Sequence, residues 1–418
     1  MDSCFSPAEK MKRRTFLKQT AAIAAAATTA HYLPSASAGT VPVSPVAVRR
    51  CPKYDPNLIY DTLGQMFTDL GGISTMVNGK NVSIKINCVS LGNYNHSLHT
   101  KYTQTTNPDV VYAACRLFLA AGAARINIME GFQTTNPIST VLPQLGYDQA
   151  AFEALGNGNQ VRFYSTRNKE TDPPNTDSGF AAYTRVDTLS NGIGSGDPYL
   201  FDYFYFNRMW LAPKTDVIVS IPKMKGHSVG GVTLSIKNMF GCTPPTIYGG
   251  TTPITLATGP DENCTTARNA SCHLGTWTPV GERTGHGVVA NACERIPRLL
   301  VDLNRALPVS FAIIDGITGV QSEMGPGAST SVTTPGVLIA GTNVVCVDSV
   351  AVGVMGGNPM AAAGTDLWPS GQNHIALAAA KALGSNDLSL IPVLGDSIAS
   401  VRYDYYPTVN LASDNPVL

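Results

Sequence analysis

Apolar residues recur along the middle of the chain with the periods of buried strands and helices. Val82 to Ile86 is a short strand-like run, and apolar residues then recur at helical spacing between Asn107-Pro108-Asp109 and Gly122. An asparagine cap with proline in the first turn begins a helix, and glycine ends one. Arg125 to Met129 follows as a second strand. The pattern predicts a β–α–β unit whose strands pair in parallel through a right-handed crossover.

The same alternation returns in the second half of the chain. Val217 to Ile221 is almost continuously apolar, which is typical of a strand buried on both faces. Helices are predicted at 295–303, 343–355 and 375–383, and strands at 310–314, 337–340 and 390–394. The sequence therefore predicts an α/β fold with largely parallel sheets flanked by helices. Residues 242–285 are rich in Thr, Gly and Pro, and we expect a long irregular insertion over the site.

The first 38 residues have the pattern of an export signal. Met11-Lys12-Arg13-Arg14-Thr15-Phe16-Leu17-Lys18 precedes a ten-residue apolar run, Ala21 to Ala30, and then Ala36-Ser37-Ala38. This pattern predicts a twin-arginine signal peptide over residues 1–38 that is cleaved after Ala38. The twin-arginine translocase would be a partner during export, and the mature protein would be periplasmic or extracellular.

The mature chain is predicted as a lead segment (39–80), one α/β domain (81–398, with the insertion 242–285) and a C-terminal tail (399–418). No other segment approaches the roughly twenty apolar residues that a membrane-spanning helix needs, so no span is expected in the mature chain. The chain has 29 basic and 29 acidic residues, and removal of residues 1–38 leaves a net charge of about −3. That balance does not predict a nucleic-acid partner.

Eight cysteines remain after the predicted cleavage, and none is spaced Cys-x-x-Cys. An iron–sulfur cluster or a structural zinc site is therefore not expected. Cys264 and Cys272 lie eight residues apart in a loop of a predicted exported chain, so a disulfide is predicted between them. Cys115 and Cys346 lie in apolar helical runs and are predicted to be buried thiols.

The densest polar segment, Lys223 to Gly241, follows the strand that ends at Ile221. Its candidate functional residues are His227, Gly230, Gly231, Thr233, Lys237 and Asn238. Adjacent glycines after a strand can expose backbone N–H groups as an anion-binding nest, and the flanking lysines add positive charge. Either this segment binds a carboxylate or phosphate, or its glycines form a tight turn and its lysines a solvated face.

Three carboxylates stand out. Glu130 and Asp315 each follow a predicted strand, at the edge where open α/β sheets bind ligands. Each could be a general base or a metal ligand, or equally a helix or turn cap. Asp348 lies inside an apolar helical run, where a structural hydrogen bond is a better expectation than catalysis.

Histidines offer few metal sites, and common catalytic motifs are absent. His96 and His99 are spaced as ligands on a helix could be, but their segment is predicted as loop. His286 lies between two glycines at the end of the insertion. No G-x-S-x-G elbow, P-loop, G-x-G-x-x-G after a first strand, or H-E-x-x-H occurs in the sequence.

A series of motifs follows one order along the chain: Lys85-Ile-Asn87, Thr105-Thr-Asn-Pro108, Ala121-Gly122-Ala123, Lys225-Gly-His227 through Lys237-Asn238-Met-Phe-Gly241, Asp315-Gly316-Ile317, Gly325-Pro326-Gly327, Gly341 and Asp348. This series resembles the bacterial and archaeal family known as domain of unknown function 362. Several members carry a ferredoxin-type cluster domain. This chain lacks those cysteines.

The stretch from His227 to Lys237 is also similar, more distantly, to a segment of nickel-dependent lactate racemase. There a histidine acts as acid or base and a lysine ten residues later holds a nickel-pincer nucleotide. The resemblance implies a cofactor beside Gly230, Gly231, Thr233, Lys237 and Asn238. It also implies His286 as a ligand of nickel or another divalent metal. The proline-glycine pair that follows the racemase lysine is replaced here by Asn238-Met239-Phe240-Gly241.

Together these features predict an exported enzyme that acts on a small anionic substrate with a metal or nucleotide-derived cofactor. The chemistry would be acid–base or hydride transfer, as in racemases or oxidoreductases, with His227, Lys237 and Asp315 as catalytic residues. We expect these three residues and His286 to converge on one pocket. The alternative is a non-catalytic periplasmic protein that binds an anion or a metal for a partner.

Overall fold

The computed structural model describes residues 41–88, 101–132, 134–169, 174–264, 269–288, 290–321, 331–369 and 371–405. The predicted signal peptide, His96, His99, the motif Gly325-Pro326-Gly327 and the end of the tail lie outside these ranges. Within them, no helix is long and apolar enough to cross a membrane.

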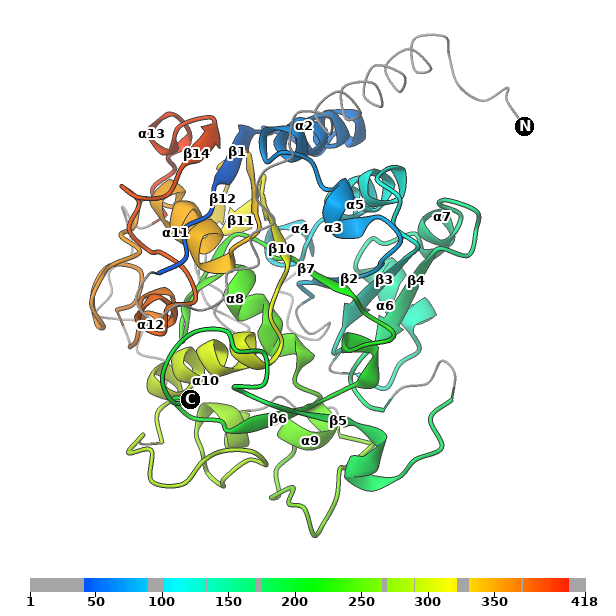
Figure 1. Cartoon of the computed structure of the whole chain (residues 1–418), viewed down its shortest axis with the longest axis vertical. Coiled ribbons are helices and arrows are strands. Elements are labelled where there is room, and N and C mark those ends of the chain that lie inside the picture. Colours follow the sequence, from blue (N-terminus) through cyan, green and yellow to red (C-terminus); the bar gives the residue numbers. More distant parts are fainter. Residues whose placement is uncertain are drawn as a thin grey trace.

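An eight-stranded sheet forms the centre of the molecule, in the order β14-β1-β13-β10-β7-β2-β3-β4 (Figure 1). Its strands are β1 (Val46–Arg50), β2 (Asn81–Ile86), β3 (Arg125–Glu130), β4 (Val161–Ser165), β7 (Val217–Ile221), β10 (Phe311–Gly316), β13 (Val337–Gly341) and β14 (Val393–Gly395). The pairings are parallel except that β13 runs antiparallel to both β10 and β1. The predicted α/β class and the parallel pairing of the first two predicted strands are confirmed.

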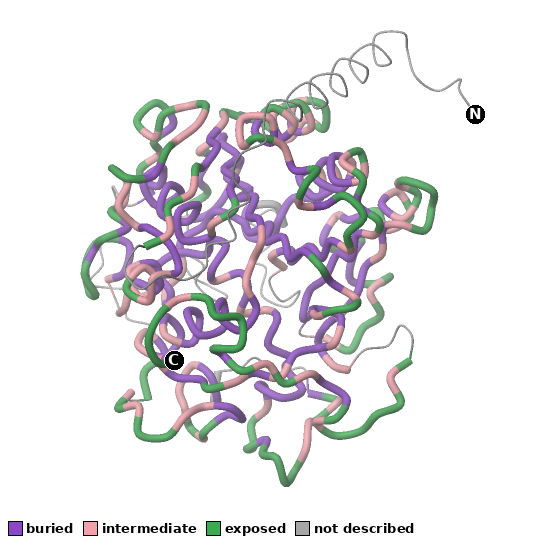
Figure 2. The backbone as a smooth tube through the Cα atoms, in the orientation of Figure 1, coloured by how far each residue is buried: buried purple, intermediate pink, exposed green. Residues whose placement is uncertain are grey.

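Helices cover both faces of this sheet. One face packs against α2 (Pro56–Asp69), α3 (Ser74–Val77) and α5 (Pro108–Ala120), and the other against α8 (Ser235–Asn238), α10 (Ala292–Ala306), α11 (Val344–Val354) and α12 (His374–Ala380). Successive strand residues point to opposite faces, so Val219 packs in the first core and Ile218 in the second. Figure 2 shows the buried strands between these layers, with exposed loops at the rim.

Shorter elements fill the connections between the main strands and helices. The short helices are α4 (Lys101–Gln104), α6 (Ile138–Gln144), α7 (Gln149–Glu153), α9 (Pro245–Tyr248) and α13 (Ile398–Val401). Two-stranded ribbons pair β5 (Thr184–Asp187) with β6 (Tyr203–Phe206), β8 (Lys225–His227) with β9 (Gly231–Thr233), and β11 (Gly319–Val320) with β12 (Val332–Thr333). The β8–β9 hairpin lies within the polar segment that the sequence singles out.

Two segments outside the strongest sequence pattern contribute to the packed structure. The segment 39–80 supplies α2 and also β1, which is paired between β13 and β14. Within 242–285, Tyr248 and Cys272 are fully buried in the core that also contains α10. Apolar side chains in both segments are therefore part of the main cores.

The predicted disulfide between Cys264 and Cys272 is not formed. Both residues are buried, reduced thiols. Cys264 lies beside Gly250, whereas Cys272 packs in the core near Tyr248. A spacing of eight residues in a loop does not by itself bring two side chains to the distance and angle that a disulfide requires. Cys115 and Cys346 are buried thiols, as predicted.

Asp348 makes the structural hydrogen bonds that its sequence context suggests. From inside α11, its two carboxylate oxygens accept hydrogen bonds from the backbone N–H groups of Ser235 and Ile236, each at 2.8 Å. The first N–H groups of a helix have no partner within the helix, so this side chain supplies one. Burial raises the pKa of Asp348 to about 7, against the opposing effect of those two N–H donors. The carboxyl group thus fixes α8, and with it Lys237, against α11.

We expect Asp348→Asn to change how stability depends on pH. The pKa of this carboxyl is about 7 in the folded protein, against an ordinary value of 3.8 for an aspartate in an unfolded chain. Between those values the folded protein retains a proton that the unfolded chain has released, so this group makes stability fall as pH rises, by about 1.4 kcal/mol per pH unit. Urea denaturation should therefore show a shallower decline across this window in the variant.

The matched control is Asp387→Asn. Hydrogen bonds from Ser389 hold the pKa of that carboxyl below its usual value, so this substitution should leave the slope in the same window unchanged. Equal slopes for the wild type and Asp348→Asn would contradict the assignment.

Candidate functional site

The order of strands reverses direction between β2 and β7. From β2 the chain proceeds outward to β3 and β4, then returns to β7 and proceeds the other way to β10 and β13. Open α/β sheets bind ligands at the carboxyl ends of the strands at such a point, because the following loops separate there. The polar residues that follow β2 and β7 therefore occupy the part of this fold best suited to a ligand.

A buried ion pair joins β2 to β3 at this edge. The Lys85 ammonium lies 2.8 Å from a carboxylate oxygen of Glu130, and the two side chains are 1% and 4% exposed. Lys85 Nζ also donates to the carbonyl oxygen of Ile86 at 2.7 Å. Glu130 accepts hydrogen bonds from the N–H groups of Cys88 and Gly131. These bonds offset the cost of burying two charges.

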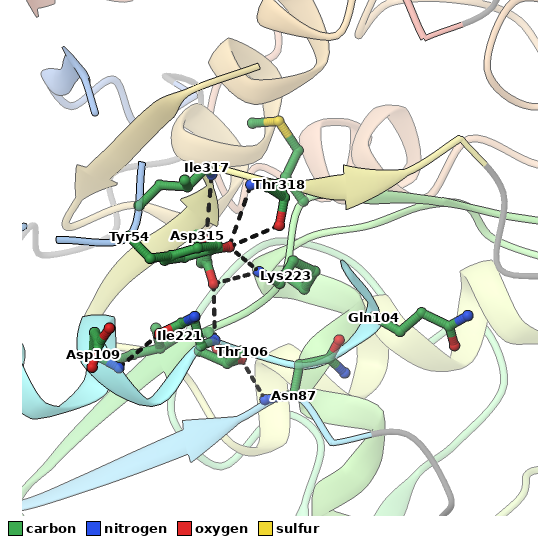
Figure 3. A network of polar contacts seen from close by, with 12 residues as sticks. Tyr54, Asn87, Gln104, Thr106, Asp109, Ile221, Lys223, Asp315, Ile317 and Thr318 are labelled. Atoms are coloured by element: carbon green, nitrogen blue, oxygen red, sulfur yellow. Dashed lines mark hydrogen bonds and ion pairs between the residues drawn. The ribbon is translucent and has the colours of Figure 1, made fainter. Parts of the chain in front are cut away.

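A second buried ion pair joins β7 to β10. Lys223 Nζ lies 2.6 Å from Asp315 Oδ2, and neither side chain is exposed. Figure 3 shows the Tyr54 hydroxyl between them, 2.7 Å from the Lys223 ammonium and 3.0 Å from Asp315 Oδ1. Asp315 also accepts from the backbone N–H of Asn107, the residue that caps α5. This carboxylate therefore fastens β7, β10 and the beginnings of α2 and α5 to one another.

The two pairs have a structural role in this arrangement. Both oxygens of Asp315 are engaged, so proton abstraction or metal ligation by it would require breaking the pair. Burial lowers the pKa of Lys223 while Asp315 opposes that shift, and burial raises the pKa of Tyr54 well above its usual value. Asp315, a predicted catalytic residue, lies in the scaffold beneath the hairpin.

The β8–β9 hairpin presents one polar face. Lys225 is directly opposite Thr233, and His227 is directly opposite Gly231. Opposite residues of an antiparallel pair share a face, and so do residues two apart in a strand. Lys225, His227 and Thr233 therefore point to the same side, toward which a Cβ at Gly231 would also point.

The glycine pair makes room for two other side chains. A Cβ at Gly230 would lie 3.0 Å from Lys237 Cδ, so the lysine side chain passes across this glycine. At Gly231, where φ is +75°, a Cβ would lie 2.5 Å from Trp368 Nε1. The N–H groups of Val229 and Gly230 donate to the ring of His227, so these two groups are not available to form an anion-binding nest.

The imidazole of His227 is held in one neutral form. Its Nδ1 accepts hydrogen bonds from Val229 at 3.0 Å and Gly230 at 3.1 Å, so the ring proton of the neutral form resides on Nε2. Burial lowers the pKa of His227 well below its usual value, and the charges of Lys237 and Lys225 lower it further. The arrangement favours donation of a hydrogen bond from Nε2 over uptake of a proton by Nδ1.

The remaining predicted cofactor residues differ in role. Asn238 donates to the carbonyl oxygen of Lys85 and to Ser220 Oγ, each at 3.0 Å, and thereby ties α8 to β2 and β7. Thr233 is 2% exposed, and its hydroxyl has no partner among the described residues. Thus Asn238 is structural, and Thr233 has hydrogen-bonding capacity left for a ligand.

His286 lies in a separate network. Its Nε2 is 2.8 Å from Glu282 Oε1, its Nδ1 accepts from the N–H of Val288, and Glu282 also pairs with Arg295. Both ring nitrogens are engaged, and the described ranges hold no group of three or more His, Cys, Asp or Glu residues arranged to bind a metal. The residues around His286 do not fit the nickel site that the racemase resemblance implies.

Of the four residues expected to converge, the structure brings His227 and Lys237 together. Asp315 belongs to the ion pair beneath them, and Lys225 influences both Lys223 and His227. A surface hollow of about 620 Å³, lined by residues of α6, α7 and their connection, includes none of these residues. The sequence did not indicate that Lys85 and Lys223 are the cations of the two buried ion pairs. It also did not indicate that Trp368 lies beside Gly231, or that His374 lies near His227. The only sequence signal for His374 was its position after the capping residue Asn373.

Comparison with known proteins supports the family resemblance over part of the chain. The model of the family described as "Domain of unknown function (DUF362)" matches residues 198–353, a segment that contains β7, the hairpin, α8, β10 and β13. No curated protein matches the chain.

A crystal structure of a protein from Thermotoga maritima aligns at 15% identity and a TM-score of 0.34, over 68% of this chain and 56% of that one. The present chain thus spans little more than half the length of that protein. A likeness this weak supports no functional argument.

We expect Lys223→Met to destabilise the fold by about 3–5 kcal/mol, because it leaves the Asp315 carboxylate buried without its cation. The double variant Lys223→Met/Asp315→Leu should recover most of that loss, since it removes both charges. Arg402→Met, at the exposed Arg402–Asp404 pair, is the control and should cost less than about 1 kcal/mol. Urea denaturation measures all three. A double variant no more stable than Lys223→Met would contradict the ion-pair account.

We expect Gly231→Ala to destabilise the protein more than Gly79→Ala does. The two glycines have similar φ values, +75° and +71°, so the backbone strain of an alanine is matched at roughly 1–2 kcal/mol. A Cβ at Gly79 meets nothing within 4 Å, whereas at Gly231 it overlaps Trp368 and the carbonyl oxygen of Leu367. Thermal unfolding and tryptophan fluorescence measure the difference. Equal losses would mean that Trp368 does not pack on Gly231.

Proposed function

We propose that this protein is an enzyme that binds a small anion, a carboxylate or phosphate, on the polar face of the β8–β9 hairpin. His227 and Lys237 would stabilise negative charge on an oxygen of the substrate. The observation that carries the proposal is the pinning of His227 Nδ1 by two backbone N–H groups beside a lysine. The position of the hairpin after β7, at the reversal of strand order, supports it.

A neutral histidine fits this role for a physical reason. A ring whose Nδ1 faces two N–H donors cannot protonate there without placing three donors against one another, so it remains neutral and donates from Nε2. Neutral imidazole in such a setting polarises a carbonyl or carboxylate oxygen without carrying a charge itself. The lysine supplies the charge, and a fixed donor beside a cation stabilises an oxyanion that develops during reaction.

The alternative is a protein that holds the anion without transforming it. The same hairpin face would serve either role, so binding alone does not separate them. Incubation with a panel of small carboxylic acids in D₂O does. A site that stabilises the charge on the carboxylate oxygen lets solvent take the proton from the neighbouring carbon and return a deuteron, whereas a binding protein gives no such exchange. Loss of incorporation in Lys237→Met would place that activity at this site.

Export is part of the same proposal. The twin-arginine motif, the short apolar run and the cleavage pattern within residues 1–38 support transport into the periplasm or beyond. The twin-arginine route transports folded chains. A protein whose proposed site joins distant segments would then arrive with that site assembled.

We expect acetate affinity, measured by isothermal titration calorimetry, to fall at least about tenfold in Lys237→Met and in His227→Phe, because each removes a donor to the anion. Lys237→Arg should retain most of the affinity. Lys53→Met removes a lysine whose side chain is 70% exposed and should have no effect. Binding that is insensitive to both site variants would contradict the proposal.

The pH dependence separates the donor role of His227 from a proton-accepting one. Because its pKa lies well below the usual imidazole value, His227 stays neutral between about pH 5.5 and 8, where an ordinary imidazole titrates. We therefore expect acetate affinity to be nearly constant over this range. If acetate affinity instead rises as the pH falls, and if His227→Gln abolishes this rise, then His227 takes up a proton and is not a neutral donor.

A further inference from the structure

Buried polar atoms without partners gather beside the hairpin. Thr233 Oγ1, Trp368 Nε1 and both ring nitrogens of His374 have no partner at normal hydrogen-bonding geometry among the described residues. Their residues are 2%, 1% and 0% exposed. The backbone of Gly230 lies near enough to the His374 ring to oppose the lowering of its pKa, but not in the geometry of a full hydrogen bond. Leaving a buried donor or acceptor unsatisfied costs roughly 1–3 kcal/mol, and native proteins seldom leave several together. A ligand or bound water that forms hydrogen bonds with these atoms would remove that cost.

The contacts of these side chains place them around one spot. Trp368 Nε1 lies 2.5 Å from where a Cβ of Gly231 would stand, on the face that His227 and Thr233 share. The rings of Trp368 and His374 are 6.2 Å apart and approach edge to face. Burial lowers the pKa of His374 to about 3, with Lys237 as the next cause. Lys237 therefore lies close to both His227 and His374.

Trp368 and His374 are held in place by hydrogen bonds within the segment that carries them. Asn373 caps α12 by accepting from the N–H groups of Ile375 and Ala376. Its amide also donates to the carbonyl oxygens of Pro359 and Ala361, each at 3.0 Å. His374, the first residue of α12, is thereby fixed relative to the loop that carries Trp368. Groups fixed in this way can bind a ligand with little loss of conformational freedom.

The chemistry of the group restricts the ligand. Lys237, the Trp368 indole and His227 Nε2 are all donors, which suits the oxygens of an anion. Neutral His374 differs, because one of its nitrogens is an acceptor. A bare oxyanion would leave that nitrogen unsatisfied, whereas a ligand that also carries a hydroxyl group would satisfy it. The Thr233 hydroxyl can donate or accept as the ligand requires.

We propose that Trp368 and His374 complete the ligand site on the hairpin, and that the ligand is a small oxyanion which also carries one hydrogen-bond donor such as a hydroxyl group. This inference rests on the proposed function of the hairpin, since it assigns the opposite wall of the same site. It assigns to His374 the hydrogen bond from the ligand donor, and to Trp368 a hydrogen bond to an oxygen of the ligand.

Glycolate and acetate test this pair of assignments, because they differ by one hydroxyl group. In the wild type we expect glycolate to bind about tenfold more tightly than acetate, by isothermal titration calorimetry. His374→Phe keeps an aromatic ring beside Trp368 and removes both nitrogens. It should reduce glycolate affinity to that of acetate and leave acetate within about twofold of the wild type. Trp368→Phe removes the indole N–H and should weaken both anions alike.

The outcomes separate this inference from the proposed function. If the wild type binds both anions equally, or if His374→Phe keeps the preference for glycolate, bound water satisfies His374 and this inference is wrong while anion binding at His227 and Lys237 stands. If the wild type binds neither of these anions and does not bind inorganic phosphate, both proposals are wrong. Should His374→Phe not fold, the ¹⁵N resonances of the histidine rings decide: glycolate but not acetate should shift those of His374 in the wild type.

Discussion

Burial of charge at the carboxyl edge of the sheet is the constraint on which the rest of this structure depends. Two lysine–carboxylate pairs, Lys85–Glu130 and Lys223–Asp315, lie at the ends of central strands with almost no exposure. An ion pair taken out of water is tolerated only when further hydrogen bonds satisfy both groups. Here backbone N–H groups, a carbonyl oxygen and the Tyr54 hydroxyl do so. The Lys223–Asp315 pair holds the residues between β7 and the hairpin against β10.

The hairpin that follows this edge carries the residues of the proposed site. Its two glycines admit the side chains of Lys237 and Trp368, and the turn amides hold His227 neutral. Because the ring of His227 is neutral, it adds a hydrogen-bond donor of fixed direction without repelling the charge of Lys237. In the proposed site the positive charge therefore comes from Lys237, and the hydrogen bond that would orient a ligand comes from His227. Asp348 supports both by holding the first turn of α8, on which Lys237 lies.

The proposed site is built from segments that are distant in sequence. The family match over residues 198–353 covers the hairpin and its scaffold but ends before Trp368 and His374. Those two residues reach the site because α12 packs beside α10 and α11 in the second core. The hairpin side of the proposed site thus lies within the matched segment. The proposed preference for a ligand with a hydroxyl group would depend on His374, which lies beyond the matched segment.

The sequence by itself determined the class of fold and much of its framework. Periodicity found β2, α5, β3, β7 and α11 to within a few residues, because burial on both faces leaves a strong local signal and asparagine caps mark helix starts. It also singled out His227, Lys237 and the glycine pair, and it predicted a structural Asp348. Only the tertiary structure decided the partners. It placed Asp315 against Lys223 and Glu282 between His286 and Arg295, and it left Cys264 and Cys272 as thiols, since pairing follows packing in three dimensions and not a motif's spacing along the chain. His374 and Trp368 belong to the proposed site for the same reason, because the local sequence around them does not indicate which residues lie across the core.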